Sequence, residues 1–415
     1  MTTSPVATTT ATTAASADLM RQVTDAANRH DPYPIYARLR ENRVNLLSDG
    51  SYALGRYADV VGLLHDPRIS SDPHHASDPG SRLLVDNAPF IQRDPPDHDR
   101  LRFIATRYFG PPVSPGVVSG QEPEILSFVN GLVDDLPSSG EADLVDHLAY
   151  PLPVSVICGL LGVPKTDDEQ FHAWTEEIVR GLDAEQQEGA DDLIKQREQA
   201  QIAMFGYVTE LVQRHRTQPD GSMLSRLAND QTGQQMTDGE LGTTSLLLLI
   251  AGHETTVNLT ANGVLTLLRN PWALERLRAE PDWVIPLVEE LLRFEPPVQY
   301  LPNRVALADI DLDGTTIPKG ARIVLLVAAA NRDPDRFADP DRFDPDRGDI
   351  EHVGFGSGIH YCFGAPLARI ETQASLTAFA RRLAGPRLAA DPPPYRPSPV
   401  LRGPLHLRVT YDKRD

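Results

Sequence analysis

The chain has 415 residues, of which 40% are hydrophobic and 23% are charged, so it is long enough to bury a sizeable core. Its formal net charge of −19 argues against general binding to nucleic acid or to an anionic membrane, because both surfaces are negatively charged. Two cysteines, Cys158 and Cys362, are too few for a disulfide framework and give no sign of an oxidising compartment.

The first twenty residues are rich in threonine and alanine and lack the basic and apolar regions of a signal peptide. We expect a disordered leader over residues 1–20 and one folded domain over residues 21–415. The longest apolar run, LLLLIA at 246–251, is much shorter than the roughly 18 residues that a membrane span needs. The sequence therefore predicts a cytoplasmic protein without a membrane segment.

Most of the chain reads as helix, with short strands near its two ends. Alternating apolar residues predict a strand within residues 51–57, and apolar residues at three- and four-residue spacing then predict helices. Asp-Gly between two short β-prone pieces predicts a hairpin, and a last alternating segment predicts a strand. The fold class is therefore mainly α with small β-sheets. The helices are expected at 124–136, 167–182 and 197–215, the hairpin at 310–317 and the last strand at 404–411.

One predicted helix is unusually long. Thr237 and Glu240 have the spacing of a capping box, the helical pattern continues to Arg269, and Asn270-Pro271 ends it. At 1.5 Å per residue this helix is roughly 48 Å long. Its segment SLLLLIAG is apolar on every face, which predicts burial at the centre of the molecule.

The segment AGHETT, residues 251–256, interrupts the large apolar side chains of this helix. Ala251 and Gly252 are small, so another group can approach the helix there. Glu254 and Thr255 then place a carboxylate beside a hydroxyl. Taken alone, the residues favour an ordinary role, in which Thr255 bonds back to the carbonyl of Ala251 and Glu254 is a surface charge.

A glycine-rich loop, FGSGIHYCFG at 355–364, surrounds Cys362. Its glycines permit unusual backbone angles and close approach of another body. Pro366 suits the first turn of a following helix, so Cys362 lies just before a helix N-terminus, which favours a thiolate.

A thiolate can be a nucleophile, a zinc ligand or a haem ligand. Zinc would need further ligands, and only His352 and His360 are nearby in the sequence. A nucleophile would need a histidine base and an oxyanion hole, for which the sequence gives no sign in either direction. Haem iron needs only one strong ligand from the protein on that side.

The cysteine loop resembles that of the cytochrome P450 family, whose pattern is FxxGxxxCxG. The match is complete at Phe355, Gly358, Cys362 and Gly364. Further motifs follow the order and spacing of that family, and the resemblance runs from about residue 31 to about residue 409. AGHETT is similar to the family's oxygen-activation motif in its long central helix.

Two more segments extend the resemblance. Glu290 and Arg293 look like the family's ExxR pair, although their spacing alone is common on exposed helix faces. The segment DPDRF at 339–343 is similar to one whose arginine, here Arg342, joins that pair. The resemblance implies a buried structural cluster of Glu290, Arg293 and Arg342.

The resemblance also implies a cofactor, haem b (iron protoporphyrin IX), with Cys362 as the ligand of its iron. The haem propionates would be bound by His98, Arg102, Arg304 and His360, and the macrocycle would lie against Phe355, Ala251 and Gly252. Thr255 would hydrogen-bond dioxygen, and Glu254 would relay protons to it. The substrate pocket would include Leu247, Ile250, Val298 and Leu301.

The implied activity is that of a monooxygenase that hydroxylates or epoxidises an apolar or amphipathic small molecule. The chain has no GxGxxG segment and no cysteine cluster, so electrons must come from a separate ferredoxin or flavodoxin and its reductase. We expect a tailoring step in bacterial polyketide or macrolide antibiotic biosynthesis, with a steroid or terpenoid substrate as the alternative. Three rival functions are a peroxide-using enzyme of the same fold, a non-catalytic haem protein and a haem-free cysteine hydrolase.

Overall fold

The structure, a computed structural model, describes residues 16, 18–77, 88–110, 113–180 and 190–415, and the chain divides into two compact units. Each unit is built from segments that are far apart in the sequence. The first comprises Met1–Arg82, Glu289–Cys362 and Pro399–Arg402, and the second comprises Leu83–Val288, Phe363–Ser398 and Gly403–Asp415.

Folded structure begins earlier than the predicted boundary after residue 20. Residues 18–24 are helical, and Leu19, Met20 and Val23 are buried in a hydrophobic cluster of the first unit. Their spacing puts them on one face of the helix, and burial of that face holds the segment in place. The expectation of a disordered leader is therefore wrong for residues 18–20, while residues 1–15 and 17 lie outside the described chain.

The main sheet of the first unit has five strands in the order β1-β2-β8-β5-β3. Strands β2 and β8 are parallel, and the other neighbouring pairs are antiparallel. Separately, β6 and β7 form the predicted hairpin, in which Asp313 and Gly314 both have positive φ, as a two-residue turn requires. The strands are β1 (Asn45–Leu46), β2 (Tyr52–Leu54), β3 (Ile69–Ser70), β5 (Leu301–Ala306), β6 (Ile310–Leu312), β7 (Thr315–Ile317) and β8 (Arg322–Leu325).

Short helices flank this sheet and bury its apolar side chains. One hydrophobic cluster gathers around Tyr36 and Leu39, and another around Leu54, Ile323 and Leu325, all of which are 0% exposed. The helices of the unit are α2 (Tyr33–Glu41), α3 (Tyr57–Leu64), α14 (Val327–Ala330) and the 3-10 turns Ala26–Asn28, Pro73–His75 and Gly358–His360. Helix α13 (Val284–Phe294) begins in the second unit and ends in the first.

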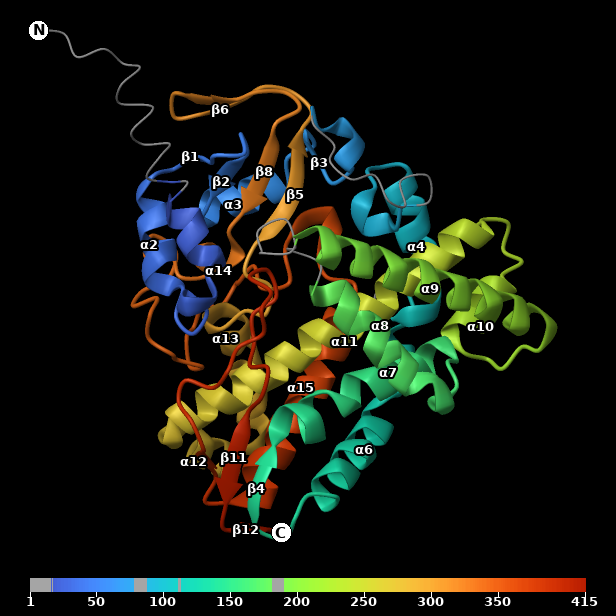
Figure 1. Ribbon diagram of the computed structural model, residues 1–415, viewed down its shortest axis with the longest axis vertical. Coiled ribbons are helices and arrows are strands. Elements are labelled where there is room, and N and C mark those ends of the chain that lie inside the picture. The colour runs from blue at the N-terminus through green and yellow to red at the C-terminus, as the bar shows by residue number, and fades with distance from the viewer. Residues whose placement is uncertain (1–15, 17, 78–87, 111–112, 181–189) are drawn as a thin grey trace, which may run out of the picture. The chain divides into compact units, whose positions relative to one another are not determined.

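The second unit is mostly helical, and its longest helix, α11, packs against α7, α9 and α15 (Figure 1). Its helices are α4 (Asp97–Phe109), α5 (Pro115–Ser119), α6 (Glu122–Asp134), α7 (Pro151–Leu161), α8 (Asp168–Arg180), α9 (Ala190–Thr217), α10 (Met223–Ala228), α11 (Asp238–Arg269), α12 (Pro271–Ala279) and α15 (Ala365–Arg382). Its shorter turns are Phe90–Gln92, Lys165–Asp167, Pro281–Trp283 and a π-helix, Val145–Ala149. The sequence therefore predicted the helical nature of this region correctly.

The ends of α11 are those that the sequence predicts. Thr237 accepts a hydrogen bond from the backbone N–H of Glu240 at 3.2 Å, and the Glu240 carboxylate accepts one from the N–H of Thr237 at 2.8 Å. The helix runs for 32 residues and ends at Asn270. The capping box and the full length of the helix are both confirmed.

Two small sheets complete the second unit. One has the order β10-β11-β4 and the other pairs β12 with β9. Their strands are β4 (Gly140–Asp143), β9 (Leu383–Ala384), β10 (Arg387–Leu388), β11 (Arg408–Tyr411) and β12 (Lys413–Arg414). The predicted last strand is thus present, and the mainly α fold with small sheets is confirmed.

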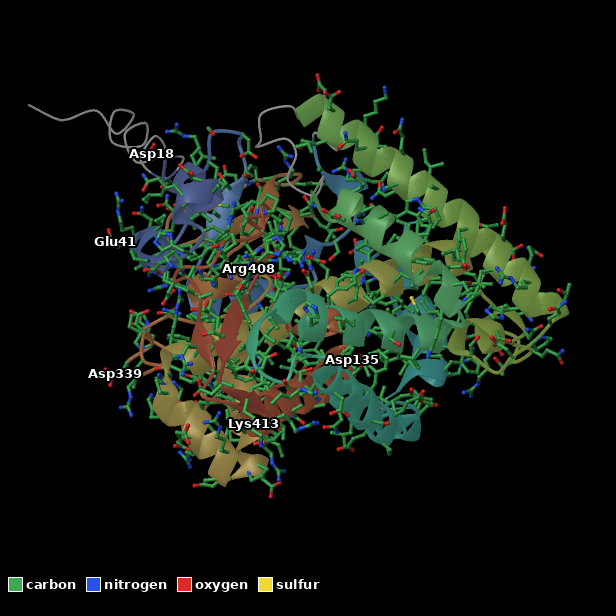
Figure 2. All side chains as sticks on the ribbon, turned by 60° about the horizontal axis from the view of Figure 1, so that its bottom comes forward. Asp18, Glu41, Asp135, Asp339, Arg408 and Lys413 are labelled. Carbon is green, nitrogen blue, oxygen red and sulfur yellow. The ribbon has the colours of Figure 1, made fainter. Side chains whose placement is uncertain are left out.

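Acidic side chains such as Asp18, Asp135 and Asp339 project from the ribbon into solvent (Figure 2), which agrees with the net charge of −19. Among the helices of the described residues, not one combines the length and the apolar character that crossing a bilayer demands.

Helix α15 contains one buried carboxyl group that lacks a charged partner. Glu371 is 1% exposed, and among the described residues neither of its carboxyl oxygens has a hydrogen-bond partner. Burial raises the pKa of Glu371 well above its ordinary value of 4.5. Burial in the folded protein therefore favours the protonated, neutral form of this side chain.

We expect Glu371→Gln to stabilise the protein by an amount that grows as the pH rises from 5 to 7. Between its ordinary pKa of 4.5 and its raised pKa in the folded protein, the carboxyl ionises more readily in the unfolded chain, so rising pH favours unfolding of the wild type. The difference should grow by up to about 1.4 kcal/mol per pH unit. Urea unfolding of both proteins at three pH values measures it, with Glu210→Gln, at an exposed position of α9, as the control. A pH-independent difference would contradict the prediction.

Candidate active site

The loop around Cys362 is held by its own backbone. The Cys362 N–H donates to the carbonyl of Phe355 at 2.9 Å, and Gly356 and Gly358 have φ of 70° and 67°. A Cβ on Gly358 would lie 2.3 Å from the backbone oxygen of Leu64, so only glycine fits there. The loop is therefore a fixed turn that presents a half-buried thiol, which forms no disulfide.

The third glycine of the loop behaves differently. Gly364 has an ordinary φ of −83° and is the N-cap of α15, with Pro366 in the first turn as expected. A Cβ on Gly364 would meet no atom of the chain within 4 Å. Gly364 therefore does not adopt the unusual backbone angles that a glycine permits, unlike Gly356 and Gly358.

The Glu290–Arg293 pair is formed and wholly buried, not exposed on a helix face. Both side chains are 0% exposed, and Arg293 donates two hydrogen bonds of 2.7 Å to the two carboxylate oxygens. Its remaining N–H groups donate to the backbone carbonyls of Asn331, Pro340 and Arg342 at 2.8–3.1 Å. Every polar group of the Arg293 guanidinium thus has a partner, which is the condition under which a buried pair is tolerated.

The third member of this cluster is Arg347, not the predicted Arg342. Arg347 Nε donates to Glu290 at 3.2 Å and its side chain is 9% exposed. The Arg342 side chain is 68% exposed and lies 3.5 Å from Asp344, and only its backbone carbonyl faces the pair. The residue pattern DPDR occurs three times, at 333–336, 339–342 and 344–347, and the path of the backbone brings the arginine of the last copy, Arg347, to Glu290.

Strand β5 of the first unit carries two of the remaining predicted residues. Arg304 lies opposite Ile323 of β8, and Leu301 lies opposite Leu325. Arg304 donates to the carbonyl of Asn303 at 3.4 Å. Val298 forms an isolated bridge with Leu401 just before this strand.

Helix α11 has one open stripe along an otherwise buried stretch. Ala251 is exposed, and Leu247, Ile250 and Thr255 are partly exposed, whereas His253, Glu254 and their neighbours on the other faces are buried. These four positions are three and four residues apart and share one helix face. Apart from this stripe, the leucines of the segment are buried as expected.

The side chains of AGHETT divide between different surroundings. Thr255 donates its hydroxyl proton to the carbonyl of Ala251 at 3.0 Å, as the ordinary interpretation predicts, and its lone pairs can still accept. A Cβ on Gly252 would lie 3.0 Å from the Ile157 side chain, so Gly252 is small because α7 packs there. Making room for a cofactor is therefore not needed to explain Gly252.

Glu254 is buried, and its partner was not predicted. Its Oε1 lies 2.9 Å from Nη1 of Arg396, and the two side chains are 5% and 14% exposed. Arg396 comes from the segment between β10 and β11, far away in the sequence. No local pattern in the sequence points to this contact.

Helix α4 places the two predicted propionate ligands of the second unit one turn apart. His98 is 2% exposed, and its Nδ1 lies 2.8 Å from Asp99. The guanidinium of Arg102 lies 5.8 Å from the ring centre of Phe363, which is the residue after Cys362. Phe363 in turn packs against Phe109 at 4.4 Å between ring centres.

Of the predicted haem-binding residues, Cys362, Phe355, His360 and Arg304 belong to the first unit, and His98, Arg102, Ala251 and Gly252 belong to the second. The donor set suits a haem, because a thiol outside any disulfide can bind iron while two arginines and two histidines can bind two carboxylates. The open stripe of α11 adds an apolar surface with a small residue at its centre. The residues that are present therefore fit the cofactor.

A small cavity lies beside α11 and is lined by residues that include Tyr150, Cys158, Leu249 and His253. Its volume of about 10 Å³ has room for roughly one water molecule. It is too small for an organic substrate. Cys158, 3% exposed, is a buried packing residue there.

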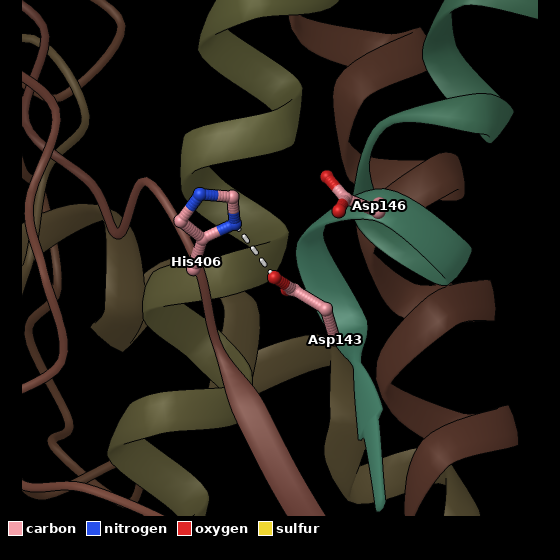
Figure 3. A group of neighbouring side chains, drawn as sticks. All are labelled: Asp143, Asp146 and His406. Atoms are coloured by element: carbon pink, nitrogen blue, oxygen red, sulfur yellow. Dashed lines mark hydrogen bonds and ion pairs between the residues drawn. The ribbon is translucent and has the colours of Figure 1, made fainter.

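A zinc site at Cys362 has no support among the described residues. There, the one group of three metal-ligating side chains is Asp143, Asp146 and His406, which excludes Cys362 (Figure 3). Asp143 already accepts the backbone N–H groups of Val145 and Leu407 and lies 2.7 Å from His406 Nδ1. These hydrogen bonds give the group a structural role, which is to hold a turn in place.

Comparison with known proteins agrees with this geometry. A family model described as Cytochrome P450 matches residues 163–384. The Vitamin D(3) 25-hydroxylase of Pseudonocardia autotrophica is 40% identical over 398 residues, which cover 92% of this chain and 94% of that protein. The polyketide biosynthesis cytochrome P450 PksS of Bacillus subtilis is 32% identical over 403 residues, which cover 92% of this chain and 96% of that protein.

Among solved structures, Mycobacterium smegmatis CYP164A2 in its ligand-free state is similar with a TM-score of 0.87 at 38% identity. The similarity covers 95% of this chain and 99% of that one. The family model matches more than half of the chain, and the relatives are similar over nearly all of it. These comparisons all assign the chain to the same family. The chain belongs to the cytochrome P450 family and is therefore an oxidoreductase that uses haem.

Proposed function

We propose that the protein is a haem b monooxygenase that hydroxylates or epoxidises an apolar small molecule, with Cys362 as the iron ligand. The observation that carries the proposal is the combination of a fixed loop, whose cysteine forms no disulfide, with a long helix that places Glu254 and Thr255 at successive positions. A thiolate-ligated haem supplies the activation of dioxygen. Electrons come from a ferredoxin or flavodoxin and its reductase.

The chain's own residues would bind the haem propionates, orient a hydrogen-bonding group and supply protons. His98, Arg102, Arg304 and His360 hold the two propionates by charge and hydrogen bonding. The Thr255 hydroxyl, fixed by its bond to Ala251, would accept a hydrogen bond from a water molecule beside the stripe. Glu254, one residue before it, delivers protons towards that hydroxyl.

The substrate that we propose is a polyketide or macrolide-like molecule of secondary metabolism. Two considerations support it: the stripe formed by Leu247, Ile250 and Ala251 is aliphatic, and one relative is named for polyketide biosynthesis. A steroid-like substrate is the second candidate, because another relative is named a vitamin D(3) hydroxylase. Both classes are apolar and suit this face.

The first test of the function is the carbon monoxide difference spectrum of the dithionite-reduced protein. A strongly red-shifted Soret band, as thiolate ligation gives, supports Cys362 as the ligand. A band at the histidine-like position would overturn the proposal. Turnover of a polyketide lactone and of vitamin D3 with a ferredoxin system, but not with hydrogen peroxide, then separates the monooxygenase from a peroxide-using enzyme.

We expect Thr255→Ala to lower the yield of oxygenated product per electron pair at least about tenfold, with hydrogen peroxide released instead, since positioned proton donors typically contribute 10²–10⁴-fold. Thr255→Ser keeps the hydroxyl and should retain most of the yield. Thr256→Ala is the neighbouring control, because Thr256 is 3% exposed and lies off the open stripe. Product and peroxide are measured for each NADPH consumed, and an unchanged yield in Thr255→Ala would contradict the assignment.

A further inference from the structure

The segment between β10 and β11 lies against α11 at the acid of AGHETT. Arg396 donates its backbone N–H to the carbonyl of Gly403 at 3.0 Å, which closes this segment into a turn. Its side chain reaches Glu254. A Cβ on Gly403 would lie 2.2 Å from Oδ1 of Asn258, one helical turn after Glu254. The turn therefore touches α11 at two successive positions of one face.

The Glu254–Arg396 contact is close, but polar atoms around it lack hydrogen-bond partners among the described residues. Glu254 Oε1 and Arg396 Nη1 are 2.9 Å apart, yet among the described residues neither Glu254 Oε1 nor Arg396 Nε has a hydrogen-bond partner. Both amide atoms of Asn258, a residue that is 0% exposed, lack partners in the same set. Buried polar atoms in this condition are normally satisfied by ordered water.

The buried ion pair of Glu290 and Arg293 differs from the Glu254–Arg396 pair in its hydrogen bonding. Glu290 and Arg293 are joined by two hydrogen bonds, and the remaining N–H groups of Arg293 donate to backbone carbonyls. A buried ion pair offsets its desolvation only when its geometry is good and its other polar atoms are satisfied. The Glu254–Arg396 pair meets neither condition, so stability does not account for it.

We propose that Arg396 is a positioning residue for proton delivery: it holds the Glu254 carboxylate beside Thr255 and releases it to a neighbouring water each time a proton is passed. The role rests on the proposed function of Glu254. In each cycle Glu254 takes one proton from water and gives one proton towards the Thr255 hydroxyl, so the carboxylate returns to its charged state and to Arg396. The unsatisfied atoms of Glu254, Arg396 and Asn258 mark where that water binds.

The test uses the haem-loaded full chain with dioxygen as the only substrate. With NADPH, a surrogate ferredoxin and its reductase, each electron pair passed to dioxygen requires two protons to form hydrogen peroxide, so no organic substrate has to be known. We expect Arg396→Met to lower this NADPH oxidation rate about tenfold, as misplaced catalytic groups commonly do. Arg396→Lys, which keeps the charge, should restore at least half of the wild-type rate.

A double-mutant cycle distinguishes positioning from a merely structural role. In the Glu254→Gln background Arg396→Met should change the rate less than about twofold, because Arg396 acts only through Glu254. An equal loss in both backgrounds, or a normal rate for Arg396→Met, would overturn the proposal. Arg387→Met, which removes an exposed pair with Asp412, is the matched control and should leave the rate unchanged.

Thermal unfolding of the same four proteins provides a readout that does not depend on turnover. The fall in Tm caused by Arg396→Met should be at least halved in the Glu254→Gln background, since the buried partner is then neutral. Additive shifts in Tm would show that the pair is not formed. Coupled Tm shifts would show that the Glu254–Arg396 pair exists, whatever the function. If the wild-type protein then gives no thiolate-type spectrum, the proposed function is wrong. The role of Arg396 in proton delivery would be wrong with it.

Discussion

Replacing Cys362 by serine is expected to abolish both the thiolate-type carbon monoxide spectrum and oxygen insertion. The reason is electronic, because an anionic sulfur donates electron density to haem iron and a neutral hydroxyl does not. The loop itself should persist, because its conformation depends on the Cys362 N–H bond to Phe355 and on Gly358, which serine leaves in place. Haem content and the spectrum are measured on the purified variant.

Cys158→Ser is the matched control for this experiment. Cys158 is the only other cysteine of the chain and is buried against α11, so its replacement removes a thiol without touching the loop. This variant should retain the wild-type spectrum. A red-shifted band in Cys362→Ser, or its loss in Cys158→Ser, would contradict the assignment of the iron ligand.

The second large effect is expected for Glu290→Ala. Removing the carboxylate leaves the guanidinium of Arg293 buried without its counter-charge, and breaking a buried pair in this way typically costs about 3–5 kcal/mol. The loss of stability should affect the segment 338–347 most, because the Asp344 N–H and the Arg347 side chain also donate hydrogen bonds to Glu290. We expect poorly folded, haem-free protein, measured by the ratio of haem to protein and by urea unfolding.

Two arginine variants show whether this cluster is the one that the structure describes. Arg347→Ala removes a buried side chain that bonds to Glu290 and to three backbone carbonyls, so it should lose haem almost as readily. Arg342→Ala removes a side chain that is 68% exposed and keeps the carbonyl that Arg293 uses, so it should stay within about 0.5 kcal/mol of the wild type. The reverse order would restore the interpretation made from the sequence.

Several features could be predicted because they depend on residues close together in the chain. The start of α11 follows from Thr237 and Glu240, which bond to each other across three residues, and Asp313-Gly314 adopts the positive φ values of a tight hairpin. The cysteine loop with its two strained glycines likewise follows from one short segment. Short-range steric and hydrogen-bonding rules decide such features wherever the segment lies.

The errors concern choices among residues that are equivalent in the sequence. Arg342 and Arg347 stand at the same place in two of the three copies of DPDR, and only the path of the backbone brings Arg347 to Glu290. Gly252 is predicted to lie against a cofactor, and the structure adds a packing contact with Ile157 of α7 that the sequence does not indicate. Both questions are settled by which element packs on which face, and no spacing along the chain records that.

The sequence by itself determined the family, the mainly helical fold and the identity of the one cysteine placed in a rigid glycine loop. The tertiary structure alone decided which arginine completes the buried cluster, which stripe of α11 is open, and that Arg396 lies against Glu254. Patterns within a few residues are fixed by local geometry, whereas a buried charge takes as its partner whichever opposite charge the packing of distant segments brings within reach.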